Sequence, residues 1–218
     1  MNIKDISWIR KAVYHWRNCR NKHSYNSGKN NKVVNRGGIR VGSRIQVCGT
    51  GNRVVLEKGS MLLNSLVKIQ GDNNVVILKA HSYVSGAELW VEDNQCELSI
   101  GERTFVGHHS HLACTENGSK LIVGDDGMLS SYVQIRTGDS HSIVDMEGRR
   151  INQAQSVVVG DHCWLGEGAK VMKGVTLEGD VIVSTGAVVT KSFGKKVLLG
   201  GIPAKVLKDN VSWDKERI

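Results

Sequence analysis

The second half of the chain repeats a hydrophobic pattern every six residues. From Val159 it divides into the hexads VGDHCW, LGEGAK, VMKGVT, LEGDVI, VSTGAV and VTKSFG. The first position of each hexad is a branched aliphatic residue, and the fifth is mostly small. An amphipathic helix has a period of 3.6 residues and a strand a period of two, so neither explains this pattern. A period of six predicts flat faces separated by corners, with three faces forming a coil of about 18 residues.

The same signature recurs upstream with wider spacing. Hexad-like segments begin at Leu56, Leu78, Ile100 and Val123, at intervals of 22, 22 and 23 residues. The additional residues fall in the polar stretches QGDNN, EDNQ and TENGS, which are rich in turn-forming residues and are expected to bulge from one corner. The next interval, to Val159, is 36 residues. Because residues 136–156 lack the aliphatic rhythm, we predict an external loop there.

These patterns predict an all-β fold, a parallel β-solenoid in which each coil contacts only its neighbours. We expect the β-helix over residues 31–195, with the external loop at 136–156. Residues 196–218 form a C-terminal extension, expected to be a short helix or an irregular tail. Residues 1–30 are predicted to be a helical cap.

The cap is predicted from the stretch DISWIRKAVYHWRN, which has an amphipathic pattern. Its apolar side consists of Ile6, Ile9, Val13 and Trp16. The basic face of this helix could contact a membrane surface, but we favour packing against the end of the solenoid. Arg10 and Lys11 interrupt the apolar run, so it does not resemble a signal peptide.

Composition narrows the class of protein. The 218 residues include 25 glycines, one proline and two phenylalanines, which suits many tight corners around a narrow core. Five scattered cysteines without a C-x-x-C pair argue against a disulfide framework or a zinc ribbon. No segment reaches the roughly 18 apolar residues that cross a bilayer. We therefore expect a reduced, cytoplasmic protein.

The charge balance suggests an anionic partner. Twenty-nine Lys and Arg residues against 21 Asp and Glu residues give a formal net charge of +8. Such a surplus fits nucleic acid, phosphate, an acidic glycan or a membrane face. The chain has no nucleic-acid-binding signature and no run of five basic residues, so nucleic acid is not expected.

The run VGDHCWLGEGAKVMKGVTLEGDVIVSTGAVVTKSF, followed by GGIPAK, resembles the left-handed β-helix acetyltransferases of the hexapeptide-repeat superfamily. The resemblance covers about residues 50–208. IRTGDSH, with Trp164 following 23 residues after its histidine, is similar to bacterial polysialic acid and capsular or lipopolysaccharide O-acetyltransferases. This resemblance implies a left-handed coil and a homotrimer with active sites between subunits. The resemblance also implies acetyl-CoA as the acetyl donor and a sugar hydroxyl as the acceptor.

His141 and Trp164 are the candidate catalytic residues. Acetyl transfer needs a base that works near neutral pH, and histidine is the usual side chain for this role. His141 lies in the external loop, where an excursion from a flat coil can surround a substrate. The alternative is a simple surface histidine. For Trp164 the resemblance implies a place beside the acetyl group or pantetheine arm, whereas the alternative is packing at a subunit interface.

The resemblance also implies residues that contact coenzyme A. The amide of Gly166 is a candidate to stabilise the oxyanion, because glycine lets the backbone approach closely. Further candidates lie along the C-terminal coils and after Pro203, where the resemblance places the nucleotide end of coenzyme A: Thr185, Thr190, Lys191, Lys205 and Lys208. Each lysine taken alone could equally be a solvated surface charge.

Other polar residues are candidates for contact with the acceptor. Arg136 and Asp139 flank His141 and could orient it or hold the acceptor, although Asp139 is also a common turn residue. VGHHSH places His108, His109 and His111 together, which suggests a zinc site. Their spacing does not match the zinc histidines of β-helical carbonic anhydrases, so no metal is expected. We expect this cluster to line a groove, with His109 as a candidate acceptor contact, or to be exposed.

The sequence thus favours an acetyl-CoA-dependent O-acetyltransferase acting on a bacterial surface glycan: polysialic acid, a capsule or an O-antigen sugar. The nearest alternative is an enzyme of the same fold acting on a small acceptor, such as an amino sugar, a free sugar or an antibiotic. A catalytically silent scaffold is a third possibility, and the loop with His141 argues against it.

Overall fold

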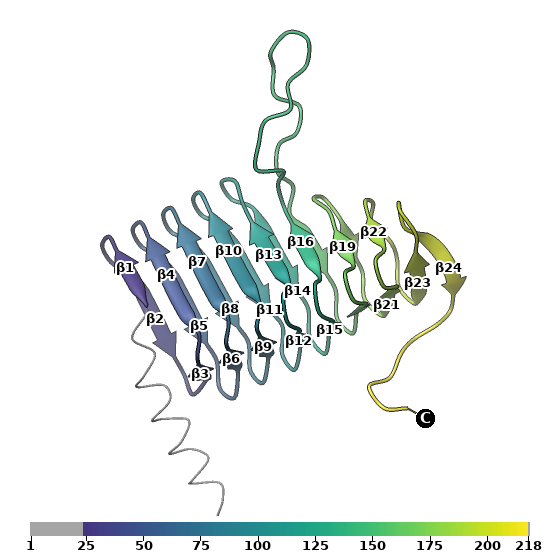
Figure 1. The fold of residues 1–218 in the computed structure, drawn as a ribbon, viewed down its shortest axis with the longest axis horizontal. Coiled ribbons are helices and arrows are strands. Elements are labelled where there is room, and N and C mark those ends of the chain that lie inside the picture. The colour runs from purple at the N-terminus through teal and green to yellow at the C-terminus, as the bar shows by residue number, and fades with distance from the viewer. Residues whose placement is uncertain (1–23, 218) are drawn as a thin grey trace, which may run out of the picture.

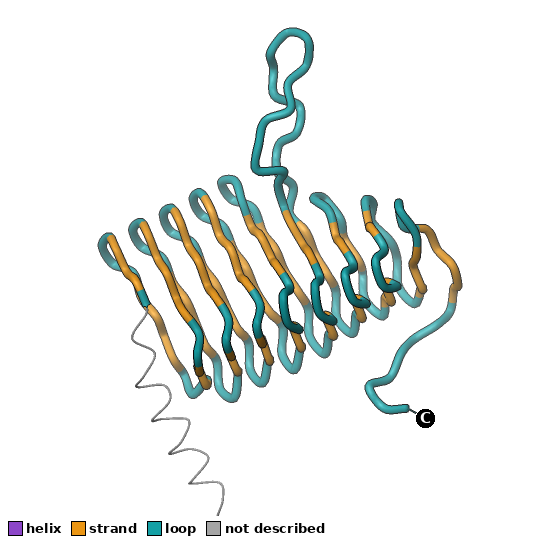
Figure 2. Tube along the Cα trace, in the orientation of Figure 1, coloured by secondary structure: helices purple, strands orange, loops and turns teal. Residues whose placement is uncertain are grey.

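A computed structural model describes residues 24–217, and these residues form strands and loops without a helix (Figures 1 and 2). The predicted N-terminal helix, with its suggested membrane contact, lies outside the described residues. No helix in the described part is long and apolar enough to cross a membrane.

The strands form three sheets, called A, B and C here. Sheet A contains β1 (Tyr25–Ser27), β4 (Arg44–Cys48), β7 (Leu66–Gln70), β10 (Glu88–Glu92), β13 (His111–Cys114), β16 (Gln134–Arg136), β19 (Lys170–Val171) and β22 (Val188–Val189). Sheet B contains β2 (Lys32–Asn35), β5 (Arg53–Leu56), β8 (Val75–Leu78), β11 (Glu97–Ile100), β14 (Lys120–Val123), β17 (Val157–Val159) and β20 (Thr176–Leu177). Sheet C contains β3 (Ile39–Val41), β6 (Met61–Leu63), β9 (Tyr83–Ser85), β12 (Phe105–Val106), β15 (Met128–Leu129), β18 (Trp164–Leu165), β21 (Val181–Val183), β23 (Val197–Gly200) and β24 (Lys205–Asp209).

Each coil passes through the three sheets in the order A, B, C, which confirms the three-faced solenoid (Figure 1). The strands stack in parallel, and only β24 runs antiparallel to its neighbour, β23, within the described residues. Leu56 pairs with Leu78, and Leu78 pairs with Ile100, so an interval of 22 residues is one coil. Val123 pairs directly with Val159. The interval of 36 residues is therefore also one coil, which carries the external loop.

The hexad pattern builds the core. The side chains at the first positions are completely buried: Val159, Leu165, Val171, Leu177, Val183 and Val189. The small residues at most fifth positions are buried beside them: Cys163, Ala169, Val175, Val181 and Ala187. Burying one aliphatic side chain of this size contributes about 1.5–3 kcal/mol, so the repeated pattern holds each coil closed.

The corners between sheets B and C require a left-handed backbone. His81, Arg103, Asp126, His162 and Asp180 stand at this corner in successive coils, and each has a φ between 49° and 58°. Asn, Asp and His tolerate this conformation better than β-branched residues do, which explains the polar residues between the aliphatic ones. His81 and His162 are therefore corner residues of the solenoid.

The external loop leaves the solenoid between β16 and β17, at the corner between sheets A and B (Figure 1). The three polar insertions predicted from the sequence lie at the same corner in the preceding coils. Strand β1 begins before residue 31 and β23 ends after residue 195, so stacked strands extend beyond the range expected for the β-helix. After β24 the chain continues as an irregular tail.

Candidate active site

Asn152 holds the two sides of the external loop together at its base. This residue is only 6% exposed. Its side-chain amide donates hydrogen bonds to the carbonyl oxygen of His141 at 2.8 Å and to Asp139 Oδ2 at 2.9 Å. Its Oδ1 accepts a hydrogen bond from the backbone N–H of Ile143 at 2.7 Å. One buried amide thus fixes the backbone on both sides of His141.

Two ion pairs attach the loop to the solenoid. Lys173, in the next coil, pairs with Asp139, and Arg150 in the loop pairs with Glu116 on the preceding coil. The Lys173 ammonium lowers the pKa of Asp139, and Arg150 lowers the pKa of Glu116, so both carboxylates stay ionised near neutral pH. The loop is therefore held from both adjoining coils.

His141 lies in the wall of a pocket of about 230 Å³ at this corner. The pocket is lined by the loop and by the two preceding polar insertions: Glu92, Asp93, Thr115, Glu116, Ser140, His141, Ser142 and Arg150. The His141 side chain is exposed, and its ring makes no hydrogen bond within residues 24–217. An imidazole placed in this way is accessible to a substrate.

The two flanking candidates have different positions. Asp139 bonds to the side chains of Asn152 and Lys173 rather than to the ring of His141, so it helps to hold the loop and does not orient the imidazole directly. Arg136 is half-buried at the end of β16 and is not among the residues that line the His141 pocket.

Trp164 lies elsewhere on the coil. It is the first residue of β18, just after the corner between sheets B and C, and is separated from the loop corner by the face of sheet B. Its indole Nε1 is 3.4 Å from Ser130 Oγ, and its ring lies 6.0 Å from that of Trp213. Within one chain, His141 and Trp164 do not share a pocket.

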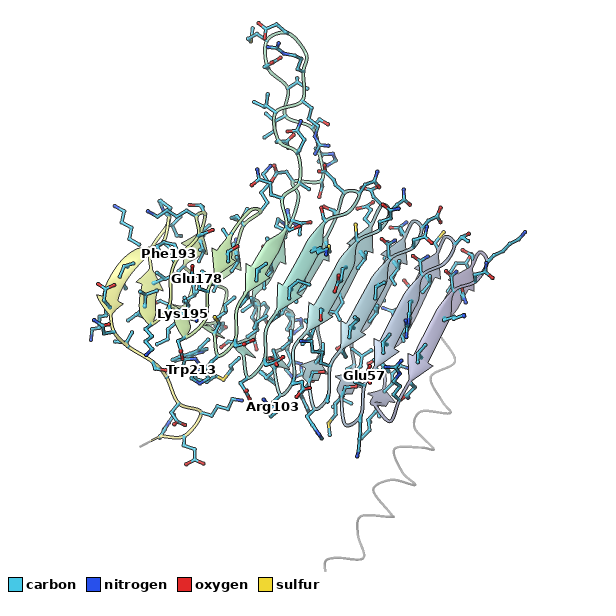
Figure 3. The ribbon with its side chains drawn as sticks, turned by 180° about the vertical axis from the view of Figure 1, so that it is seen from behind. Glu57, Arg103, Glu178, Phe193, Lys195 and Trp213 are labelled. Atoms are coloured by element: carbon cyan, nitrogen blue, oxygen red, sulfur yellow. The ribbon has the colours of Figure 1, made fainter. Side chains whose placement is uncertain are left out.

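The C-terminal tail packs on this second location. Trp213 is 8% exposed, stacks on the ring of His162 at 4.7 Å and donates its indole N–H to the His162 carbonyl at 2.8 Å. His162 Nδ1 lies 2.7 Å from Asp180 Oδ1, and this contact lowers the pKa of Asp180. Figure 3 shows Trp213 beside the last coils, away from the external loop. The tail thus covers the surface next to Trp164.

Gly166 has a structural role that corrects the sequence-based expectation. Its N–H donates to the carbonyl of Val183 at 2.8 Å, so this amide is already engaged in the stacking of coils and is not available for an oxyanion. A Cβ at this position would lie 2.7 Å from the backbone nitrogen of Thr185. Glycine is needed here because the next coil approaches so closely.

The remaining coenzyme A candidates are exposed and lie at three places on the last coils. Thr185 is at the corner between sheets C and A, next to Gly166. Thr190 and Lys191 follow β22, where the Lys191 ammonium lies 5.5 Å from the centre of the Phe193 ring. Lys205 and Lys208 lie together on β24.

The histidine cluster is divided between two environments. His109 stacks on Tyr132 at 4.9 Å, at the corner between sheets C and A, and does not line the His141 pocket. His111 packs edge-on against Trp90 on sheet A, and burial lowers its pKa. Among the described residues, no group of three or more His, Cys, Asp or Glu side chains is arranged to hold a metal ion.

Sequence reasoning missed Asn152, Lys173 and Trp213. Asn152 and Trp213 lie outside the hexad rhythm, and a single polar or aromatic residue there carries no periodic signal. The insertions EDNQ and TENGS were predicted only as turns. Their spacing did indicate that they lie side by side, because Asp93 and Glu116 are one coil apart. The N–H of Glu116 donates to Asp93 Oδ2 at 3.2 Å.

The fold is similar to that of the left-handed β-helix, hexapeptide-repeat acetyltransferases. No protein-family model matches the chain.

The similar proteins of this class include polysialic acid O-acetyltransferases. The crystal structure of the polysialic acid O-acetyltransferase OatWY has a TM-score of 0.84 and 26% identity, covering 89% of this chain and 92% of that one. The polysialic acid O-acetyltransferase of Neisseria meningitidis is 29% identical over 125 residues, which are 56% of this chain and 57% of that protein. The enzyme of Escherichia coli O1:K1 / APEC is 28% identical over 118 residues, 54% of this chain and 38% of that protein. The aligned part thus spans 38% and 57% of the length of these two curated relatives.

Proposed function

We propose that this protein is a cytoplasmic, acetyl-CoA-dependent O-acetyltransferase that modifies a hydroxyl of a bacterial surface glycan. The observation that carries the proposal is the position of His141. Its imidazole lies in a pocket wall, on a loop held by a buried amide and two ion pairs. The fold and the sequence similarity to polysialic acid O-acetyltransferases support the same reaction.

In the proposed reaction, His141 acts as the general base. Its imidazole takes the proton of the acceptor hydroxyl while the oxygen attacks the thioester carbonyl of acetyl-CoA, and a C–O bond forms. The tetrahedral intermediate collapses, the C–S bond breaks, and the thiolate leaves. The imidazolium returns its proton to the thiolate. The products are the acetylated sugar and free coenzyme A, and His141 is again neutral.

We propose that the working unit is a homotrimer. His141 and Trp164 stand at different corners of one chain, so one site can use both only if a second copy supplies the tryptophan. Cyclic oligomers place two different surfaces of adjacent subunits against each other, which produces such composite sites. Trp164 is then proposed to form an apolar wall for the acetyl group or the pantetheine arm.

The exposed residues of the last coils are proposed to hold coenzyme A. The phosphates of its nucleotide are anionic, and Lys191, Lys205 and Lys208 offer positive charge at this end of the solenoid. Thr185 and Thr190 add hydroxyl groups at two corners of the same coils.

Lys205→Ala is therefore expected to raise the KM for acetyl-CoA about 3- to 10-fold, because one solvent-exposed hydrogen bond contributes a net of about 0.5–1.5 kcal/mol. The KM for the glycan and kcat should change little. Steady-state kinetics with each substrate varied in turn measure this. Lys29→Ala, an exposed lysine at the opposite end of the solenoid, is the matched control. Equal effects of the two substitutions would contradict the assignment.

Asn152 is proposed to position His141. Asn152→Ala removes the bridge between the two sides of the loop, and we expect kcat to fall about 10²-fold, because small misplacements of a catalytic group have effects of this size. The KM for acetyl-CoA should stay within about twofold, since that ligand is held elsewhere. Gln153→Ala is the control, because the neighbouring Gln153 amide is exposed and bonds only to the carbonyl of Arg150. A rise in KM without loss of kcat would contradict a positioning role.

The proposal is tested by the release of thiol from acetyl-CoA with a panel of acceptors. The panel contains polysialic acid, neutral and acidic O-antigen fragments, amino sugars and chloramphenicol, each with wild-type protein and His141→Ala. Release that depends on His141 and on a glycan is the expected result. Release only with an amine or a small molecule would favour the small-acceptor alternative. Absence of both turnover and acetyl-CoA binding would favour a scaffold.

A further inference from the structure

The pocket beside His141 is acidic although the whole chain is basic. Its lining contains three carboxylates, Glu92, Asp93 and Glu116, and one guanidinium, that of Arg150. Arg150 is already paired with Glu116. The net charge of +8 is therefore distributed over other parts of the chain, and the wall around His141 is negative.

The three carboxylates differ in the hydrogen bonds and ion pairs that they already make within the chain. Glu116 bonds to Arg150 and to the backbone N–H of Ala154. Asp93 accepts one hydrogen bond, from the backbone N–H of Glu116. The Glu92 side chain makes no hydrogen bond or ion pair to any residue in the range 24–217. Glu92 and Asp93 therefore offer oxygen acceptors to a ligand in the pocket.

Thr115 also lines the pocket, but its hydroxyl is not offered to a ligand. Its Oγ1 is buried and has no hydrogen-bond partner among the described residues. A Cβ at Gly138 would lie 2.5 Å from this oxygen, so the hydroxyl faces the backbone at the base of the loop. The oxygen acceptors that a ligand can reach are therefore those of Glu92 and Asp93.

Resting on the proposed function, we infer that the acceptor unit bound beside His141 is an uncharged sugar residue. Its hydroxyls donate hydrogen bonds to the carboxylates of Glu92 and Asp93. A sialic acid unit would bring its own carboxylate into this negative wall, where the like charges repel. The acceptor specificity thus differs from the one named for the polysialic acid O-acetyltransferases.

The test compares kcat/KM for a neutral O-antigen fragment and for polysialic acid, with acetyl-CoA as donor. We expect the neutral acceptor to be preferred at least about 10-fold, because placing like charges against each other in a binding site is unfavourable by this much or more. Glu92→Gln should lower kcat/KM for the neutral acceptor about 10-fold, because it removes a hydrogen bond to a charged group. Glu92→Gln should not lower the activity on polysialic acid. Glu57→Gln, on the opposite corner and far along the solenoid (Figure 3), is the matched control.

The outcomes separate this inference from the proposed function. His141-dependent transfer that prefers polysialic acid, or an amino sugar, would overturn the uncharged acceptor and leave the acetyltransferase intact. Equal effects of Glu92→Gln on both polymers would also overturn it. Absence of His141-dependent transfer to every acceptor would overturn both.

Discussion

His141→Ala is expected to lower kcat by about 10²- to 10⁴-fold, the range seen when a general base is lost. The side chain is exposed and its ring makes no hydrogen bond within the described chain, so its removal should leave the fold and the melting temperature unchanged. The KM for acetyl-CoA should also change little, because the residues proposed to bind it lie on the last coils. Thiol release and thermal unfolding measure the two effects.

His81→Asn is the control for this substitution. His81 is an exposed corner histidine with φ of 58°, a backbone conformation that asparagine also adopts, and it is distant from the pocket. This variant should have wild-type turnover. Near-normal turnover of His141→Ala would show that another group removes the proton.

Gly101→Ala is expected to destabilise the solenoid by about 1–3 kcal/mol or more, because it forces two coils apart. A Cβ at Gly101 would lie 2.0 Å from the carbonyl oxygen of Gly124 in the next coil, and backbone atoms cannot move aside as a flexible side chain can. Circular dichroism during heating measures the change in melting temperature.

Gly194→Ala is the matched control. The nearest atom to a Cβ at this position is Glu178 Oε2 at 3.9 Å, which is ordinary contact, so the melting temperature should stay the same or rise slightly. Equal melting temperatures for the two variants would show that the coils can separate at this corner without cost.

The fold was largely predictable because its physical basis is periodic. One aliphatic residue per face must enter a narrow core. The hexads beginning at Val159 and Leu165 therefore indicate both the repeat length and which side chains point into the core. The break in the rhythm identified the external loop for the same reason, since a segment without inward aliphatic residues cannot form a coil.

The site was only partly predictable, because its contacts join residues that do not recur at a regular spacing in the sequence. The bonds of Asn152 to both sides of the loop depend on how the loop folds back. The amide of Gly166 was expected to be available, but the stacking of coils uses it. The acidic pocket arises because Glu92 and Glu116 come from corners of successive coils, which the sequence separates by more than twenty residues.

His141 of one copy and Trp164 of another are proposed to form one acetyl-transfer site, and complementation between two variants tests this arrangement. His141→Ala and Trp164→Ala, each inactive alone, are produced together with different tags, and mixed assemblies are purified through both tags. Every mixed trimer of the two variants keeps both side chains intact at one of its three interfaces, which is about a third of the sites. We expect glycan-dependent thiol release to return to about that share of the wild-type rate. Mixed assemblies as inactive as the two single variants would contradict a site shared between copies.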